Sequence, residues 1–136
     1  MLLSIQGLTI SFPNQPSPVV ENLTFGLNQG ECLGIVGESG SGKSLTALSL
    51  LGLLPTQAEI GGEAHFKSAS REVDLFKLSA LEQRATRGKQ IGIIFQEPMT
   101  ALNPSMRCGR QIDEMIVEHL NVSSKEAKKR TLNLLT

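Results

Sequence analysis

Gly37-Glu38-Ser39-Gly40-Ser41-Gly42-Lys43-Ser44 is the stretch that decides how this sequence is interpreted. It matches the pattern G-x-x-x-x-G-K-[ST] at every fixed position. Glycines allow positive φ angles, so we expect successive backbone N–H groups to turn inward around an anion. Lys43 and Ser44 stand at the expected start of a helix, whose N-terminus also favours negative charge. The stretch therefore predicts a loop that binds the phosphates of a nucleotide.

Two side chains of this loop have expected roles in holding a nucleotide. Lys43 is long enough to reach β- and γ-phosphate oxygens, and the Ser44 hydroxyl can bind the Mg²⁺ that bridges them. Lys43 is also the single basic residue among residues 1–60, which contain four acidic ones. ATP and Mg²⁺ are the expected ligands. The other cofactor-binding candidates are Gly37, Glu38, Ser39, Gly40, Ser41 and Gly42.

The segments on either side of the loop provide the setting that this motif requires. Residues 32–36 are a short, nearly all-apolar run, which predicts a strand buried on both faces. Residues 43–53 carry leucines around most of a helix, which predicts that this helix is buried. A strand, a glycine-rich loop and a helix in this order favour nucleotide binding.

The rest of the chain divides into a β-rich part and a helical part. Alternating apolar residues predict strands over 2–12 and 19–27. We expect an antiparallel hairpin over 56–78, around Gly61-Gly62, and a second buried strand over 91–95.

Two capping boxes, Ser79-x-x-Glu82 and Ser123-x-x-Glu126, predict the starts of helices, and an amphipathic pattern predicts another helix over 107–120. The expected fold is α/β. It has a mainly parallel core around the loop, an antiparallel β part and the start of a helical part from about residue 98.

With these motifs in place, the sequence resembles the ATP-binding subunits of ABC transporters. The resemblance rests on the phosphate loop and on Ile93-Ile94-Phe95-Gln96-Glu97-Pro98, in which Gln96 lies 53 residues after Lys43. It implies that Gln96 is the Q-loop glutamine, which reaches the Mg²⁺ and the attacking water, and that its loop touches the membrane subunits. It also implies that Phe12 stacks on adenine, where many members have Tyr, so that stacking is kept and the hydroxyl is lost.

Residues 96–104, Gln-Glu-Pro-Met-Thr-Ala-Leu-Asn-Pro, narrow the resemblance to the oligopeptide, dipeptide and nickel importer branch. The resemblance covers essentially all of the chain. It implies that residues 1–136 are the N-terminal portion of a nucleotide-binding domain. Its P-loop NTPase core of the ABC-ATPase type, with the antiparallel β part, occupies about residues 1–97, and the helical subdomain starts over about 98–136.

The resemblance also implies parts that do not occur in these 136 residues: the LSGGQ-type signature, the apolar strand ending in Asp-Glu, and the switch histidine. We therefore expect a truncated chain that binds nucleotide but lacks full ATPase activity alone. The intact protein is expected to couple ATP hydrolysis to import of peptides or a related small solute. Its expected partners are permease subunits and a second ATP-binding subunit, in a head-to-tail dimer.

Charge and hydropathy exclude other classes of protein. The chain has 13 basic and 13 acidic residues, so it has no overall positive field to hold nucleic acid. The basic run Lys125, Lys128, Lys129 and Arg130 lacks interleaved aromatics and predicts a solvated helix face. The longest apolar run, residues 45–54, is about half the length that a bilayer span requires. We expect a cytoplasmic chain, peripheral on the inner face of the cell membrane through permease subunits.

Two other interpretations remain open at this stage. A small nucleotide kinase is another P-loop NTPase, although its first strand would normally lead straight into the loop, whereas here a long β-type stretch comes first. A non-catalytic interaction module with a vestigial P-loop is the second. Thermal stabilisation by ATP would separate such a module from an ATP-binding protein.

Overall fold

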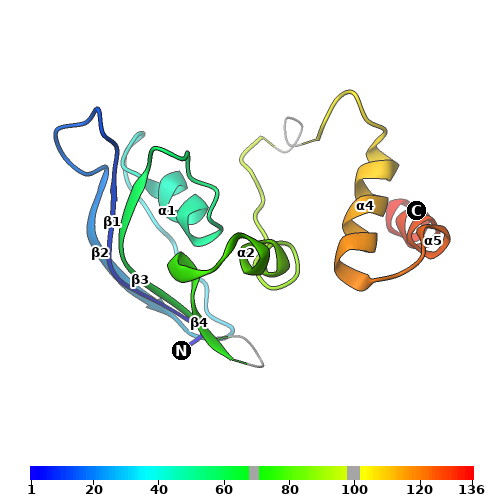
Figure 1. Cartoon of the computed structure of the whole chain (residues 1–136), viewed down its shortest axis with the longest axis horizontal. Helices are drawn as coiled ribbons and strands as arrows, with labels where there is room; N and C mark the ends of the chain where they lie inside the picture. The colour runs from blue at the N-terminus through cyan, green and yellow to red at the C-terminus, as the bar shows by residue number, and fades with distance from the viewer. Residues whose placement is uncertain (68–70, 98–101) are drawn as a thin grey trace. The chain divides into compact units, whose positions relative to one another are not determined.

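The computed structural model describes residues 1–67, 71–97 and 102–136. These residues form two compact units, Met1–Arg84 and Ala85–Thr136, each of which is described by itself (Figure 1). Residues 98–101, which belong to the stretch that indicated the importer branch, lie outside the described residues.

A four-stranded antiparallel sheet organises the first unit, in the order β2-β1-β3-β4. The antiparallel β part of the expected fold is therefore confirmed, and its first two strands lie where the alternation of apolar residues placed them. The strands are β1 (Leu3–Ser11), β2 (Val20–Leu27), β3 (Glu59–Lys67) and β4 (Glu72–Asp74).

Strand β1 supplies the centre of the apolar core. Ile5, Leu8 and Ile10 are completely buried, and β1 has a partner strand on each side. Ile5 and Leu8 are an odd number of residues apart and would face opposite sides of a regular strand. The pairing register of β1 shifts between them, at Gly7, and this irregularity allows both side chains to be buried. The other buried apolar residues of this unit are Val20, Leu51, Ala64, Phe66 and Leu75.

The hairpin expected around Gly61-Gly62 is wrong in its position. Both glycines lie inside β3: Gly61 pairs with Thr9 of β1, and Gly62 lies where the register with β1 shifts, so neither forms a turn. Gly62 has a φ angle of 91°, and a Cβ atom there would lie 2.6 Å from the carbonyl oxygens of Gln6 and Gly7. These glycines permit a close approach of two strands, which a sequence pattern does not distinguish from a turn.

Helix α1 (Lys43–Leu50) lies on one face of the sheet (Figure 1). It is shorter than expected, and the expected burial holds for Leu51, just after the helix, but not for the leucines within it. Its buried side chains are Thr46 and Ser49, whose hydroxyls donate hydrogen bonds to the carbonyl oxygens of Gly42 and Thr46 at 3.0 and 2.7 Å. Because these small side chains satisfy their own polar groups, they can form the inward face, and the leucines of the helix remain partly exposed.

The 3-10 helix η1 (Leu75–Lys77) and helix α2 (Ala80–Thr86) follow β4. The capping box before α2 is confirmed. The Ser79 amide donates to the Glu82 carboxylate at 3.0 Å, and the Glu82 amide donates to the Ser79 hydroxyl at 3.4 Å.

The two buried strands expected at residues 32–36 and 91–95 are not strands in the structure. Among the described residues, the only pairing in these segments is a single bridge between Arg87 and Ile91. Val36 is 96% exposed and Ile94 is 93% exposed. An apolar run identifies a segment suited to burial, but a strand also needs a neighbour that supplies hydrogen-bond partners.

Helices α4 (Cys108–Leu120) and α5 (Ser124–Leu135) pack on each other in the second unit. Thr131 of α5 donates a hydrogen bond to the Asp113 carboxylate of α4. The Ser123 hydroxyl accepts a hydrogen bond from the Glu126 amide at 3.3 Å, which confirms the predicted start of the last helix. In the three described ranges, no helix combines the length and the apolar character of a membrane span.

Candidate phosphate-binding site

The loop of residues 37–44 leads into α1, and two of its glycines adopt conformations that other residues rarely adopt. Gly40 and Gly42 have φ angles of 85° and 86°, which confirms the expectation for these positions. Gly42 is also the N-cap of α1, where no side chain caps the helix and no acidic residue occupies the first turn. The first amide groups of α1 can therefore bind an anion, and the loop next to them has the backbone conformation of an anion nest.

Lys43 folds back over this loop. Its ammonium donates hydrogen bonds to the carbonyl oxygens of Gly37 and Glu38 at 2.8 and 2.6 Å, and to the Ser41 hydroxyl at 3.2 Å. The only basic side chain in the first sixty residues is thereby held beside the amide groups of the loop. A phosphate bound there would meet a fixed positive charge.

Gly37 departs from the expectation that the glycines of the loop supply positive φ angles. Gly37 is not among the residues with a positive φ angle. A Cβ atom at this position would lie 2.6 Å from the Ser41 hydroxyl oxygen. Glycine at this position leaves space for the Ser41 hydroxyl, which would have to shift if a Cβ atom were present.

Ser44 follows Lys43 in the first turn of α1, and its side chain is exposed. A hydroxyl in this place is a hard oxygen ligand at the same helix end as the anion nest. Mg²⁺ in nucleotide sites usually takes few protein ligands and completes its coordination with phosphate oxygens and water. Ser44 therefore fits the requirement for one protein ligand to a nucleotide-bound Mg²⁺.

The beginning of β2 lies directly against the phosphate loop. A Cβ atom at Gly42 would lie 2.5 Å from the Val20 side chain and 3.1 Å from the carbonyl oxygen of Val19. The turn that contains Phe12 ends at Val19, whose amide donates to the Ile10 carbonyl at 2.8 Å. Phe12 itself is half-buried. Its turn is anchored beside the loop, and part of its surface is open.

Gln96 belongs to the second unit and is exposed. Its role stays a prediction. Further along the chain, the side chain of Gln111 in α4 makes two hydrogen bonds with the backbone of Asn103. It accepts from the Asn103 amide at 2.9 Å and donates to the Asn103 carbonyl oxygen at 3.0 Å. Sequence reasoning did not single out Gln111, because a glutamine on a helix gives no signal of a distant backbone partner.

A cluster of charged side chains on β3, β4 and η1 was also missed by the sequence analysis. Lys77 Nζ lies 2.9 Å from Asp74 Oδ2 and 3.5 Å from Glu63 Oε1, and His65 Nε2 lies 2.9 Å from Glu63 Oε2. The hydrogen bond with Glu63 raises the pKa of His65, and the same contact lowers the pKa of Glu63. His65 lies opposite Asp74 in the antiparallel pairing of β3 with β4. This neighbourhood depends on the strand register, which the sequence alone does not give.

Asp74 ties this cluster to the backbone. Burial opposes its charge, but the ion pair with Lys77 and hydrogen bonds from the amides of Ala64 and Phe76 hold its pKa below the usual value. Its Oδ1 accepts from these amides at 3.2 and 3.1 Å. Its Oδ2 has only the ion contact with Lys77, without the alignment of a directed hydrogen bond.

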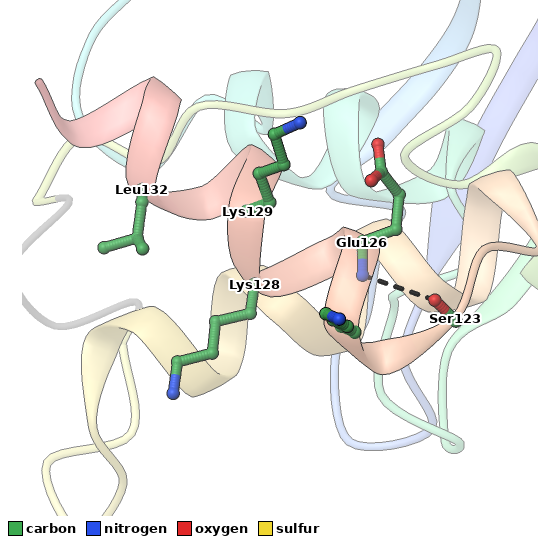
Figure 2. A pocket seen from close by; sticks show the side chains of 6 residues that line it. Ser123, Glu126, Lys128, Lys129 and Leu132 are labelled. Atoms are coloured by element: carbon green, nitrogen blue, oxygen red, sulfur yellow. Dashed lines mark hydrogen bonds between the residues drawn. The ribbon is translucent and has the colours of Figure 1, made fainter.

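Three lysines of α5, Lys125, Lys128 and Lys129, line a shallow pocket together with Ser123, Glu126 and Leu132 (Figure 2). Lys128 and Lys129 extend from the helix in different directions (Figure 2). Glu126 makes an ion pair with Arg130 at 2.9 Å, which lowers the pKa of Glu126. Cations that diverge and are partly neutralised are typical of a solvated helix face.

Comparison with known protein families decides the membership of this chain. The family model described as ABC transporter matches residues 20–135, from β2 through the phosphate loop to α5. The chain belongs to the ABC transporter family. Membership in the ABC transporter family implies the P-loop ATPase fold, of which the described residues show the antiparallel sheet, the phosphate loop and the helices.

Several ABC transporter proteins are similar over nearly the whole chain. The oligopeptide transport ATP-binding protein OppD of Escherichia coli (strain K12) is 43% identical over 98% of this chain and 39% of the relative. OppD of Bacillus subtilis (strain 168) is 44% identical over 98% of this chain and 37% of the relative. The dipeptide transport ATP-binding protein DppD of Bacillus subtilis (strain 168) is 42% identical over 99% of this chain and 40% of the relative. The chain spans about two fifths of the length of these relatives.

Proposed function

We propose that this chain binds ATP together with Mg²⁺ at residues 37–44, as the ATP-binding part of an ABC importer for peptides or a related small solute. The observation that carries the proposal is the position of Lys43. Its ammonium lies over a loop whose Gly40 and Gly42 have positive φ angles, at the N-terminus of a helix without a capping side chain. The printed names of the relatives, oligopeptide and dipeptide transport ATP-binding proteins, support the choice of solute.

Different residues of the loop hold different parts of the nucleotide. The backbone amides of the loop and of the first turn of α1 bind phosphate oxygens, and Lys43 compensates their charge. The Ser44 hydroxyl is the protein ligand of the Mg²⁺, which neutralises charge on the transferred phosphoryl group when it is bound. Phe12 stacks on adenine, and Gln96 positions the Mg²⁺ and the attacking water.

The intact protein, in this proposal, is an ATPase that works with permease subunits at the inner face of the membrane. Two ATP-binding subunits close head to tail, and each supplies its signature motif to the nucleotide of the other. Residues 1–97 contribute the ATP-binding core, and residues 98–136 begin the helical subdomain that faces the permease.

Calorimetric titration of the 136-residue chain with Mg-ATP tests this function directly. We expect saturable binding and a higher unfolding midpoint in the presence of Mg-ATP. An interaction module with a vestigial loop would show neither effect. Failure of ATP to bind or to stabilise the chain contradicts the proposal.

A further inference from the structure

We infer that Ser41 is a positioning residue for Lys43, and that glycine at position 37 leaves room for the Ser41 hydroxyl. This inference rests on the proposed binding of nucleotide phosphates and concerns what sets the strength of that binding. Ser41 occupies one of the variable positions of the phosphate-loop motif, and the inference gives its side chain a specific role.

The Ser41 hydroxyl has two close neighbours. It accepts a hydrogen bond from Lys43 Nζ at 3.2 Å. On its other side it lies above Gly37, where a Cβ atom would come within 2.6 Å of its oxygen. The hydroxyl is thus placed between the backbone of Gly37 and the ammonium of Lys43.

The contact with Ser41 completes the hydrogen bonding of the ammonium. An ammonium group has three donors, and Lys43 directs two of them to the carbonyl oxygens of Gly37 and Glu38. Ser41 is the only side chain that accepts from Lys43 among the contacts of the described residues. A lysine side chain loses much rotamer freedom when it is fixed, so a chain already held over the loop binds phosphate at a lower entropic cost.

The geometry of Gly37 makes this inference specific. Gly37 is not among the residues with a positive φ angle, so alanine there does not meet the strain of the left-handed region. The Ser41 side chain is the close neighbour of the missing Cβ, and Lys43 Cδ is at an ordinary distance of 3.9 Å. The effect of Gly37→Ala on phosphate binding must therefore act mainly through displacement of the Ser41 hydroxyl.

A double-mutant cycle on the 136-residue protein tests the contacts that link Gly37, Ser41 and Lys43. The variants are Ser41→Ala, Gly37→Ala and the double variant, and the probe is inorganic triphosphate with Mg²⁺, titrated by calorimetry. Gly34→Ala is the matched control, since Gly34 also lacks a positive φ angle and a Cβ there meets nothing within 4 Å. Unfolding midpoints measured without ligand show whether a variant is folded.

We expect each single substitution to weaken triphosphate binding about fivefold, as the loss of one hydrogen bond of about 1 kcal/mol implies. The double variant should bind about as weakly as Ser41→Ala alone, because the clash at Gly37 is absent once the hydroxyl is removed. Gly34→Ala should bind like the wild type, and all midpoints should stay close to that of the wild type.

The inference is overturned if Ser41→Ala binds triphosphate as tightly as the wild type. It is also overturned if the affinity loss of the double variant equals the product of the fold-losses of the two single variants. Losses that merely follow a fall in the unfolding midpoint overturn it as well. A different pattern marks failure of the proposed function itself. In that case the wild type does not bind triphosphate, or Lys43→Ala binds it equally well, and the inference falls together with that function.

Discussion

The backbone of Gly62 lies so close to Gly7 that a Cβ atom at position 62 would be 2.6 Å from the Gly7 carbonyl oxygen. Both glycines have positive φ angles, 91° and 61°. They meet where the pairing of β1 with β3 shifts its register, between Gln6 and Thr9. The close contact of two glycines therefore sets the bend of the central strand, and with it the burial of Ile5 and Leu8.

Gly62→Ala is expected to destabilise the chain strongly, and Gly61→Ala is its control. At position 62 the added Cβ meets backbone atoms that cannot move aside, and the left-handed conformation adds a cost of about 1–2 kcal/mol. At position 61 the φ angle is not positive, and the nearest atom, Cβ of Thr9, lies 3.8 Å away. Urea denaturation should show a loss of at least about 2 kcal/mol for Gly62→Ala and a small change for Gly61→Ala. Equal losses would contradict this account of the bend.

The parts of the structure that could be predicted depend on residues close together in the sequence. The alternation in β1 and β2, the Ser79 capping box and the N-cap at Ser123 are local patterns with local physical causes, and the structure contains them. The positive φ angles of Gly40 and Gly42 belong to the same class, because a glycine-rich loop before a helix is a local pattern.

The parts that could not be predicted depend on partners that are distant in the sequence. The apolar run 32–36 predicts burial, but whether it forms a strand depends on what pairs with it. Gly61 and Gly62 suggest a turn until their contact with β1 is known. The close approach of Val19 to Gly42, which brings the turn of Phe12 to the phosphate loop, likewise has no signal in the sequence.

Lys43→Ala should abolish most of the Mg-ATP affinity and leave the fold intact. Among residues 1–67, 71–97 and 102–136, the ammonium bonds only to the loop, so its removal takes away the charge that a phosphate needs without opening the core. Calorimetry gives the affinity, and the unfolding midpoint without ligand is the control. Equal ATP affinity for the variant and the wild type would show that residues 37–44 do not bind phosphate.

Phe12→Ala should weaken ATP binding about threefold to tenfold, since a stacking contact contributes about 0.5–1.5 kcal/mol beyond burial. Inorganic triphosphate has no base, so its affinity should hardly change. Because Phe12 is half-buried on a turn, we expect the variant to stay folded. An unfolded variant would identify Phe12 as a residue of the core, and an equal loss for both ligands would exclude stacking on adenine.

His65 should make the stability of the first unit depend on pH. Its pKa is raised above 6.5 by the hydrogen bond with Glu63, with smaller contributions from Asp74 and Glu72, while Lys77 is the cation of the same cluster. The stabilising contribution of His65 is therefore complete below about pH 6.5 and is lost as the pH rises through the raised pKa. The difference in unfolding midpoint between wild type and His65→Gln should be larger at pH 5.5 than at pH 8.5. In a Glu63→Gln background this pH dependence should shrink, and an unchanged pH dependence there would rule out Glu63 as its cause.

The 136 residues alone should not turn over ATP at a rate of about one per second. Phosphoryl transfer depends on positioning the water and neutralising charge on the transferred group. The chain carries the phosphate loop, Lys43, Ser44 and Gln96, but its sequence lacks the signature motif, the strand ending in Asp-Glu and the switch histidine that the family resemblance implies. Loss of one such electrostatic contact typically reduces the rate on the order of 10²–10³-fold, and here several are missing together. Steady-state phosphate release measures the turnover, with Lys43→Ala as the control for contaminating ATPases. Turnover near one per second that disappears in Lys43→Ala would show that these residues contain a complete catalytic site.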